Sequence, residues 1–522
     1  MIPWIIPEGK ILYRRVPCTE CQTGVWILCR AFFVFCPHKL KKKGLVLSME
    51  QMVHALQEFV WGPGMLVFFL ATGIRFTVQS GFFQFTKIPL WMGNTIGALR
   101  KNRRIRKTPD EHSISQFQSF CTALAATLGT GNITGVATAL IFGGPGSIFW
   151  LWVSAFLGMM TGYAENYLGI KYRYRNAEGK WAGGAMVYME RGLQCRPLAV
   201  IFAICCIGAS LGMGNMVQGN SMAKGLEEAF HIPSFATGTV CMILVAAVVT
   251  GGMKRIASLT ERLVPVMSAA YLGGALIVLG ANLDLTGRAF LLIFQEAFQL
   301  RAAAGGAAGY TMLQAVRMGI ARGIFSNEAG LGSSVMAHAH ADVEQPETQG
   351  MWAMAEIFID SVVVCTITAL VILVSGVYDP SAFLETIQAG GELVDGTTLT
   401  GMAFGTVIPF GEQFLAAATV LFAFATIVGW SYFGEQTATY LGREKGAAAY
   451  RLVYILLTLP GCIAAPQLIW ELSDALNGMM ALPNLLALFF LGNQVRYIKK
   501  TGRNDENRGE SNGCKERQIV LK

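Results

Sequence analysis

Charged residues are scarce in this sequence. Only 14% of its 522 residues are Asp, Glu, Lys or Arg, whereas 53% are hydrophobic and 59 are glycine. A soluble protein of this length carries about a quarter charged residues, so the composition excludes an ordinary soluble protein. Abundant glycine fits a membrane protein, because small residues let helix backbones approach closely in lipid. The composition therefore predicts an all-α integral membrane protein.

About eleven apolar stretches are long enough to cross the hydrocarbon core of a bilayer. The stretch 312–335 is the least hydrophobic of them, because Arg317, Arg322 and Glu328 interrupt it. The predicted transmembrane helices are 55–73, 115–142, 147–169, 198–222, 235–252, 262–281, 312–335, 351–377, 413–440, 449–466 and 468–492.

Lysine and arginine are absent from the predicted loop 378–412, which carries five acidic residues. Basic residues gather instead between the first two predicted helices and in the loops 170–197, 253–261 and 441–448. Because loops rich in Lys and Arg stay in the cytoplasm, we expect the N-terminus of the first helix outside and the C-terminus in the cytoplasm. These loops also explain the net charge of +8, which indicates no nucleic-acid partner.

The first 48 residues do not fit this topology. Four lysines at 39–43 would lie outside the membrane, against the positive-inside rule. The apolar run at 26–35 is interrupted by Arg30 and is too short to span. We therefore expect residues 1–48 to be a non-native N-terminal extension.

The remaining chain divides into two sets of five helices, in segments 115–281 and 282–495. An odd number of helices makes the second set enter the membrane in the opposite sense, which is the condition for an inverted repeat. The first helix and its basic loop, 49–114, precede the two sets, and a polar cytoplasmic tail, 496–522, follows them.

Each set opens with a helix that glycine interrupts. Residues 128–137 read Leu-Gly-Thr-Gly-Asn-Ile-Thr-Gly-Val-Ala, and the stretch 312–335 contains Gly319, Gly323, Gly330 and Gly332. Lipid cannot hydrogen-bond the backbone groups freed at such breaks, so they must face a buried site or a water-lined cavity. Secondary transporters bind substrate and ion at paired breaks of this kind. The alternative is that glycine only permits close packing.

Several strings between about Met49 and about Lys500 are long and specific. They are Gly129-Thr-Gly-Asn-Ile133, Gly143-Gly-Pro-Gly146, Ala164-Glu165, Gly183-Gly-Ala185, Tyr188-Met189, Phe325-Ser-Asn-Glu-Ala-Gly-Leu-Gly-Ser333, Phe358-Ile-Asp-Ser361 and the stretch Phe422–Glu435. These strings resemble those of the alanine or glycine:cation symporter family. The resemblance implies a leucine-transporter-like fold, and sodium-coupled uptake of alanine or glycine across a bacterial plasma membrane.

An amino-acid zwitterion can be bound by the ends of broken helices. Free N–H groups at one break suit its carboxylate, and free carbonyls at the other suit its ammonium group. We expect the carboxylate at the backbone of Thr130, Gly131 and Asn132. The carbonyls around Gly319 and Ile320 would face the ammonium group.

Two side chains are added to the pocket by the resemblance. It implies that Gln218 lines the substrate site and that Trp430 lies against the substrate side chain. A bulky Trp430 would favour glycine and alanine over larger substrates. Interhelical hydrogen bonding of Gln218 and interfacial anchoring of Trp430 are the alternative interpretations.

The resemblance also implies a sodium site. The carbonyls of Ala125, Leu128 and Ala423 and the hydroxyl of Thr426 would supply its oxygen ligands, which can replace the hydration shell of the ion. Thr426 could instead donate to the carbonyl four residues earlier. Ile427 stands where some family members offer a second hydroxyl, so this site has one ligand fewer.

Acidic residues inside a membrane are expected to be functional. Asp360 is the most central and is a candidate ligand for a second cation or a gating partner. Glu165 and Glu328 are expected to pair with Arg317, Arg322 or backbone donors and to hold a gate, together with Asn327.

Other functions stay open at this point. Coupling to protons rather than sodium, a broader range of neutral amino acids, the choice between alanine and glycine, and the oligomeric state are undecided. The sequence His338-Ala-His340-Ala-Asp342 raises a membrane metallo-enzyme as a remote alternative. Its i, i+2 spacing differs from the i, i+4 spacing of zinc sites on helices, so we expect no enzyme, no cofactor and no resident metal.

Overall fold

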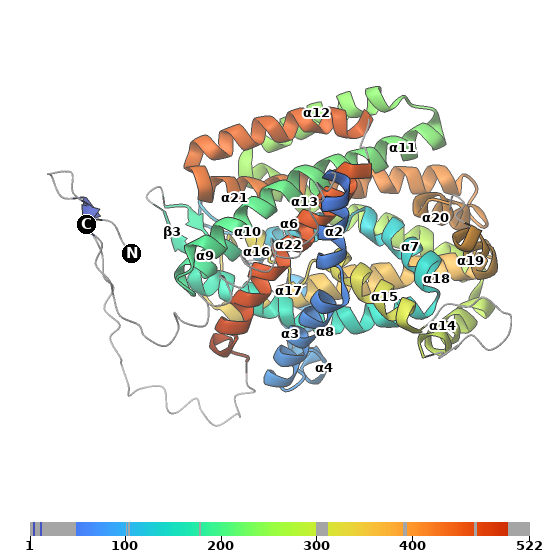
Figure 1. The fold of residues 1–522 in the computed structure, drawn as a ribbon, viewed down its shortest axis with the longest axis horizontal. Coiled ribbons are helices and arrows are strands. Elements are labelled where there is room, and N and C mark those ends of the chain that lie inside the picture. Colours follow the sequence, from blue (N-terminus) through green and yellow to red (C-terminus); the bar gives the residue numbers. More distant parts are fainter. Residues whose placement is uncertain are drawn as a thin grey trace, which may run out of the picture. The chain divides into compact units, whose positions relative to one another are not determined.

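The polar and glycine-rich interruptions of the apolar sequence become the breaks and turns of a helical protein (Figure 1). The computed structural model describes residues 4–5, 11–12, 49–100, 102, 105–176, 179–298, 312–389, 394–463 and 467–498. Most of the proposed extension 1–48 and of the tail 496–522 lies outside the described residues. The chain divides into two units, 1–52 and 53–522. In the first, the strands β1 (Trp4–Ile5) and β2 (Ile11–Leu12) pair antiparallel.

Two helices, α2 and α3, form the first predicted span, and short helices follow them. Pro63 lies at the start of α3, where its missing N–H and fixed φ are tolerated. These elements are α2 (Met49–Val60), α3 (Pro63–Gln79), α4 (Phe83–Thr86), α5 (Ile88–Asn94) and η2 (Ile96–Arg100).

The segment predicted as the first set of five contains a broken helix, a long helix and a short hairpin. A π-helix, η5, is inserted between α10 and α11. The elements are α6 (Gln116–Thr127), η4 (Thr130–Asn132), α7 (Thr134–Gly143), α8 (Gly146–Tyr172), β3 (Tyr174–Arg175), β4 (Trp181–Ala182), α9 (Ala185–Arg191), α10 (Arg196–Leu211), η5 (Gly212–Val217), α11 (Gln218–Phe230), α12 (Ser234–Val249) and α13 (Gly252–Ala281).

The second segment also contains a broken helix, followed by a helix with a π-helical insertion, η6. The elements are α14 (Leu283–Ala297), α15 (Met312–Asn327), α16 (Val335–His338), α17 (Pro346–Ile357), η6 (Phe358–Cys365), α18 (Thr366–Val374), α19 (Pro380–Ala389), α20 (Gly396–Gly405), α21 (Gly411–Ile463), α22 (Gln467–Leu491) and η7 (Gly492–Gln494).

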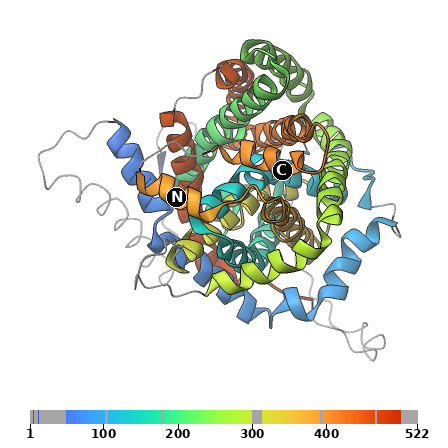
Figure 2. The ribbon, with the colours of Figure 1, turned by 90° about the vertical axis from the view of Figure 1, so that its right-hand side faces the viewer.

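Within the described residues, seven helices are long and apolar enough to cross a membrane, or eight if the pair α6 and α7 is one bent span. Helix α21 covers the two predicted spans 413–440 and 449–466. They are separated by a kink at Arg443, where φ is +53°. Figure 2 shows several of these helices nearly end-on. The fold is therefore a helical membrane protein, while the number of eleven spans and the inverted repeat stay predictions.

The first break lies where the sequence placed it. Helix α6 ends at Thr127, α7 begins at Thr134, and the two run at 61° to each other. The second break does not lie at Gly319 and Ile320. Both residues are inside the continuous helix α15, and Gly319 packs directly on the Ser147 carbonyl at the start of α8.

The chain of the second set instead unwinds after α15. Glu328, Gly330 and Gly332 have φ of +55°, +93° and +77°, a region that glycine adopts readily and other residues rarely do. The sequence did not distinguish Gly319 from Gly330 and Gly332, because close helix packing and a positive φ both favour glycine. The expectation that Gly319 and Ile320 offer free carbonyls at a break is wrong.

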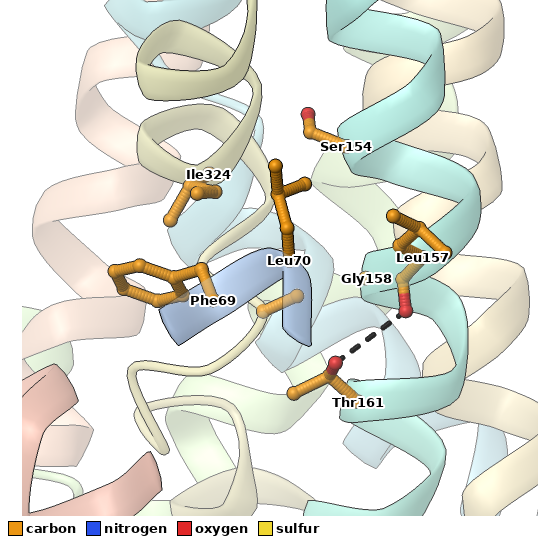
Figure 3. Close-up of a pocket in the computed structure, with 8 residues that line it drawn as sticks. Phe69, Leu70, Ser154, Leu157, Gly158, Thr161 and Ile324 are labelled. Carbon is orange, nitrogen blue, oxygen red and sulfur yellow. Dashed lines mark hydrogen bonds between the residues drawn. The ribbon is translucent and has the colours of Figure 1, made fainter. Parts of the chain in front are cut away.

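Helix α8 packs against α3, α15 and α17. The contact of α3 with α8 and α15 is close. Phe69 and Leu70 of α3 face Ser154 and Thr161 of α8 and Ile324 of α15, around a cavity of about 10 Å³ (Figure 3). A space of this size holds at most about one water molecule. Helix α3 thus packs closely against one side of α15.

Candidate substrate and cation site

The first break is held open by its own side chains. After Leu128 the backbone of Gly129 is extended, and the Gly129 N–H donates to Asn132 Oδ1 at 3.0 Å. The Asn132 amide therefore caps the break and fixes the direction in which the chain re-enters α7. This is the role that short polar side chains take where a helix restarts.

Gln218 reaches this break from the start of α11, directly after η5. Its Oε1 accepts hydrogen bonds from the Thr130 N–H at 3.4 Å and from the Thr130 hydroxyl at 3.2 Å. Gln218 is 3% exposed. The structure thus brings Gln218 to the residues that sequence analysis assigned to the substrate carboxylate. These contacts are interhelical hydrogen bonds, and substrate binding by Gln218 stays a prediction.

Thr426 of α21 meets the same break from another side. Its Oγ1 lies 3.1 Å from the Ala125 carbonyl oxygen, 3.3 Å from that of Leu128 and 3.0 Å from that of Phe422. A hydroxyl has one hydrogen to donate, so three carbonyl oxygens share a single donor. Ala423 is fully buried elsewhere on the same helix. Ala125, Leu128 and Thr426 thus lie together, and the contact with Phe422 is the alternative hydrogen bond to the carbonyl four residues earlier. The sodium site stays a prediction.

Gly129 separates these two groups of residues. A Cβ atom on Gly129 would lie 2.7 Å from Thr426 Oγ1 and 3.3 Å from Gln218 Oε1. Its φ is −128° and its ψ −156°, which any residue can adopt. Glycine is required here for space: the hydroxyl of α21 and the amide of α11 both lie against the same backbone atom.

Asp360 of η6 connects the first break to the second broken helix. Its carboxylate accepts from Asn132 Nδ2 at 2.7 Å, from the Ser326 hydroxyl at 2.8 Å and from the Ser361 hydroxyl at 2.8 Å. Asn132 Nδ2 also lies 3.1 Å from Ser326 Oγ. Four neutral and acidic side chains from three elements thus form one buried network, and a second cation at Asp360 stays a prediction.

Asn327 ends α15 and holds the second break. Its amide donates to Ser361 Oγ at 3.0 Å, and its Oδ1 accepts the Ala329 N–H at 3.0 Å. Glu328 follows it and accepts a hydrogen bond from the Ser333 hydroxyl. Neither residue is exposed by more than 3%.

Glu165 of α8 lies beside the same segment. It accepts hydrogen bonds from Asn484 of α22 and from the backbone N–H groups of Gly330 and Gly332. Backbone donors were one of the expected partners. The expected arginines take no part: Arg322 interacts electrostatically with Asp474 of α22 instead.

Trp430 is completely buried in α21 and packs on the π-helix η5. A Cβ atom on Gly214 would lie 2.5 Å from the Trp430 side chain, so the absence of a side chain at this residue of η5 leaves room for Trp430. Its ring also packs edge-on against Phe433, with centroids 5.5 Å apart. Trp430 therefore lies deep in the protein, and interfacial anchoring does not describe it.

Two residues of this region were missed by sequence analysis. Ser326 joins Asn132 to Asp360, and Asn484 joins Glu165 to the second break. The signal was a polar side chain in an apolar helix, since such groups find partners across helices in lipid. Ser326 also lies inside the family string that begins at Phe325.

The two histidines of the remote metal-site hypothesis have separate partners. His338 Nε2 lies 2.9 Å from Glu356 Oε2, whereas His340 Nδ1 lies 2.9 Å from the Met336 carbonyl oxygen. Asp342 accepts a hydrogen bond from the Thr108 hydroxyl. These three side chains do not converge on one point.

A hairpin, β3–β4, and the loop after α8 cover the end of α16. The Arg173 guanidinium donates to the carbonyls of Ala339, Ala341 and Val343 and lies on the Trp181 ring. Burial lowers the pKa of Arg173 to about 10, so the side chain stays charged at neutral pH. Arg173 thereby fastens this end of the second broken helix.

Comparison with known proteins identifies the group to which this architecture belongs. A profile of the sodium:alanine symporter family matches residues 46–516. The sodium/alanine symporter AgcS of Methanococcus maripaludis is 42% identical over 455 residues, which are 86% of this chain and 96% of the relative. An uncharacterized transporter of Haemophilus influenzae is 40% identical over 448 residues, 85% and 94% of the two chains.

The crystal structure of MhsT in complex with L-phenylalanine has a similar fold, with a TM-score of 0.50 and 16% identity, over 74% of this chain and 91% of that one. This fold is of the leucine-transporter type. The family and its relatives are transporters, which excludes the enzyme hypothesis. This chain belongs to the sodium:alanine symporter family and carries out cation-coupled amino-acid symport.

Proposed function

We propose that this protein couples sodium entry to the uptake of alanine or glycine by alternating access. The observation that carries the proposal is the junction at Gly129. There, the oxygen cluster around Thr426 and the amide of Gln218 approach the same backbone atom, 2.7 Å and 3.3 Å from the point that a Cβ atom would occupy. An ion bound at the Thr426 cluster would therefore change the position of atoms that contact the substrate site, and a bound substrate would change those of the ion site.

The oxygen cluster suits a small monovalent cation. Three carbonyl oxygens point at one hydroxyl oxygen, and carbonyl dipoles replace the hydration shell of such ions. The ligands are neutral, so they can release the ion again. We assign sodium to Ala125, Leu128 and Thr426. The third carbonyl oxygen at Thr426 is that of Phe422, and a contribution from the Ala423 carbonyl stays a prediction. The family name agrees with sodium as the coupling ion.

We place the substrate on the opposite side of Gly129. The backbone of Thr130, Gly131 and Asn132 would bind the carboxylate, because this short turn begins the second half of a broken helix. Gln218 can turn its amide to follow the substrate. Trp430 limits the size of the side chain, since η5 admits it to the interior and Phe433 supports it.

The carbonyls for the ammonium group must come from the true second break rather than from Gly319 and Ile320. Ser326 and Asn327 end α15 there, and Asp360 joins this end to Asn132. We propose that Asp360 keeps the two breaks in register, and that Glu165 and Glu328 stabilise the unwound segment as structural partners of a gate.

The orientation predicted from the basic loops places α16, the β3–β4 hairpin and the start of α6 at the cytoplasmic face of a bacterial inner membrane. The repeats 115–281 and 282–495 would then exchange access to the site between the two faces. Both statements rest on the charge pattern and on the paired breaks.

Equilibrium binding tests the assignment directly. Purified protein should bind labelled alanine more tightly as sodium is raised at constant ionic strength with potassium or choline as the replacement. Thr426→Ala should weaken this sodium dependence, whereas Thr439→Ala, in the same helix and bonded to the Glu435 carbonyl, should keep it. Alanine binding that ignores sodium would contradict the proposal.

A further inference from the structure

A buried histidine–glutamate pair lies apart from the substrate and sodium residues. His338 ends α16 and Glu356 is in α17; they are 0% and 1% exposed, and His338 Nε2 lies 2.9 Å from Glu356 Oε2. The transport mechanism proposed above does not use either side chain. We propose that this pair is a proton-binding site that controls the opening of the protein at the end that holds α16. The inference rests on the alternating-access function proposed above.

The other side of the imidazole can adapt to either protonation state. His338 Nδ1 contacts the Gln349 side-chain amide and lies 3.4 Å from Ser119 Oγ, and Gln349 also donates to Ser119 Oγ at 3.2 Å. An amide and a hydroxyl can each donate or accept. With the amide nitrogen toward Nδ1, the ring is neutral and its Nε2–H donates to Glu356. With the amide turned over, Nδ1–H of the protonated ring donates to the amide oxygen.

Two oxygen atoms beside His338 can still accept hydrogen bonds. Glu356 Oε1 and Gln349 Oε1 are buried and have no hydrogen-bond partner among the described residues. Buried polar atoms without partners are uncommon in folded proteins. One free oxygen on each side of the histidine leaves a place for a proton on the carboxylate and for the reversal of the amide.

The charges around the pair favour binding of a proton. Within the described part of the chain, Glu356 forms an ion pair with His338 alone. Glu165 of α8, Glu328 of the second break and Asp360 of η6 act on the same region, and all are acidic. The basic side chain on this side, Arg173, interacts with His340 and not with His338. His340 itself bonds the Met336 carbonyl and packs edge-on against Tyr432 of α21.

A proton on the pair therefore changes the cost of keeping it buried. With neutral His338 and ionised Glu356 the pair carries one net negative charge, next to other acids. With one more proton, on Glu356 or on His338, the net charge of the pair is zero. A buried charge without a partner is expensive, so protonation stabilises the closed arrangement, and loss of the proton favours an arrangement in which water reaches Glu356.

The pair is attached to the parts that must separate. Ser119 lies in α6, the first half of the first broken helix, and its hydroxyl donates to the Ala337 carbonyl of α16 at 3.2 Å. Ile114, just before α6, donates to the His340 carbonyl and accepts from the Asp342 N–H. The first broken helix thus meets the segment that follows the second break at this cluster. Opening toward this face requires α6 to leave α16, and the protonation state of His338 acts on that joint.

Hydrogen–deuterium exchange of the purified full-length protein tests this without substrate. Rates in peptides from α6 and from 335–342, corrected for intrinsic exchange, should rise in the wild type between pH 5.5 and 8.5. His338→Gln should remove this pH dependence. His340→Gln should keep it, because that ring bonds a backbone carbonyl outside the cluster.

A second variant should shift the pH at which exchange rises in a direction that a purely structural role of the pair would not produce. Gln349→Glu has the same shape but offers Nδ1–H a fixed anionic acceptor, which favours the protonated ring. The pH at which exchange rises should move upward by about one unit. This variant decides the question even if His338→Gln does not fold. A wild-type rate that is flat with pH, or an unchanged midpoint in Gln349→Glu, would overturn the proposal.

Transport separates this inference from the function on which it rests. In proteoliposomes with equal pH on both sides, alanine uptake driven by sodium should slow toward pH 5.5 in the wild type, and much less in His338→Gln. Absence of alanine and glycine uptake at every pH would overturn the proposed function, while the exchange experiment still decides the proton site. Equal pH profiles in wild type and His338→Gln would overturn the proton site alone.

Discussion

Gly129→Ala adds a single methyl group at the point where the proposed ion and substrate sites meet. The new Cβ would lie 2.7 Å from Thr426 Oγ1 and 3.3 Å from Gln218 Oε1, so the hydroxyl, the amide or the break itself must shift. The backbone at Gly129 is extended and tolerates alanine. The substitution therefore tests the space between the two sites rather than the conformational freedom of glycine.

The size of the effect follows from the crowding. Extra methyl groups in closely packed interiors cost about 1–3 kcal/mol, and each 1.4 kcal/mol is about a tenfold change in affinity. We expect the sodium concentration for half-maximal alanine uptake to rise between about fivefold and 150-fold. The concentration of alanine for half-maximal uptake should rise with it, because the methyl group touches both sites.

Gly135→Ala is the matched control for this experiment. Gly135 lies in α7, six residues further along the same broken helix, and a Cβ atom there meets nothing within 4 Å. Sodium-driven uptake of labelled alanine into proteoliposomes should be nearly unchanged in Gly135→Ala. If Gly129→Ala keeps wild-type values for both ion and substrate, the sites do not meet at this residue and the reasoning fails.

Three further substitutions separate ion, selectivity and packing. Thr426→Ala removes one proposed ligand and should raise the half-maximal sodium concentration about tenfold with little change in thermal stability; an unchanged sodium dependence would place the ion elsewhere. Trp430→Ala should shift competition against labelled alanine toward serine and valine, since each buried methylene contributes about 0.8 kcal/mol, and an unchanged ranking would make Trp430 a packing residue. Gly319→Ala should lower thermal stability by about 1–3 kcal/mol, because Gly319 packs on the Ser147 carbonyl; Gly273→Ala, which has open space, should not. Equal stability of these two glycine variants would contradict the packing assigned to α15.

The sequence predicted the membrane class and the first break because both have local signals. Residues 128–133 combine small, polar and apolar residues in an order that ends one helix and begins another, and α6 and α7 meet there. Thr426 and Gln218 were identified through the resemblance, and the structure brings both to Gly129. A resemblance supplies such pairs because it already contains the three-dimensional arrangement.

The second break shows what periodicity and composition do not contain. Gly319, Gly323, Gly330 and Gly332 are equivalent as letters, yet Gly319 and Gly323 pack on α8, whereas Gly330 and Gly332 have positive φ. Which pair of glycines ends the helix depends on the residues of the neighbouring helices that face each pair. Only the fold shows that Ser147 and Ser154 of α8 face the first pair.

The π-helices η5 and η6 were also not predicted. Each inserts an extra residue into an apolar helix, which turns a side chain toward the interior without changing composition. η5 makes room for Trp430 and presents Gln218, and η6 contains Asp360. Pi-helical turns often occur at functional sites, and here both border the residues assigned to substrate and ion.

Uptake of labelled alanine into proteoliposomes that contain only this protein tests the central claim most directly. With high sodium outside, low sodium inside and equal pH on both sides, alanine should accumulate above its outside concentration. Accumulation should disappear when a sodium ionophore removes the gradient, and glycine should compete with the label. Accumulation that survives the loss of the sodium gradient, or that requires a proton gradient in its place, would contradict sodium-coupled symport at the Gly129 junction.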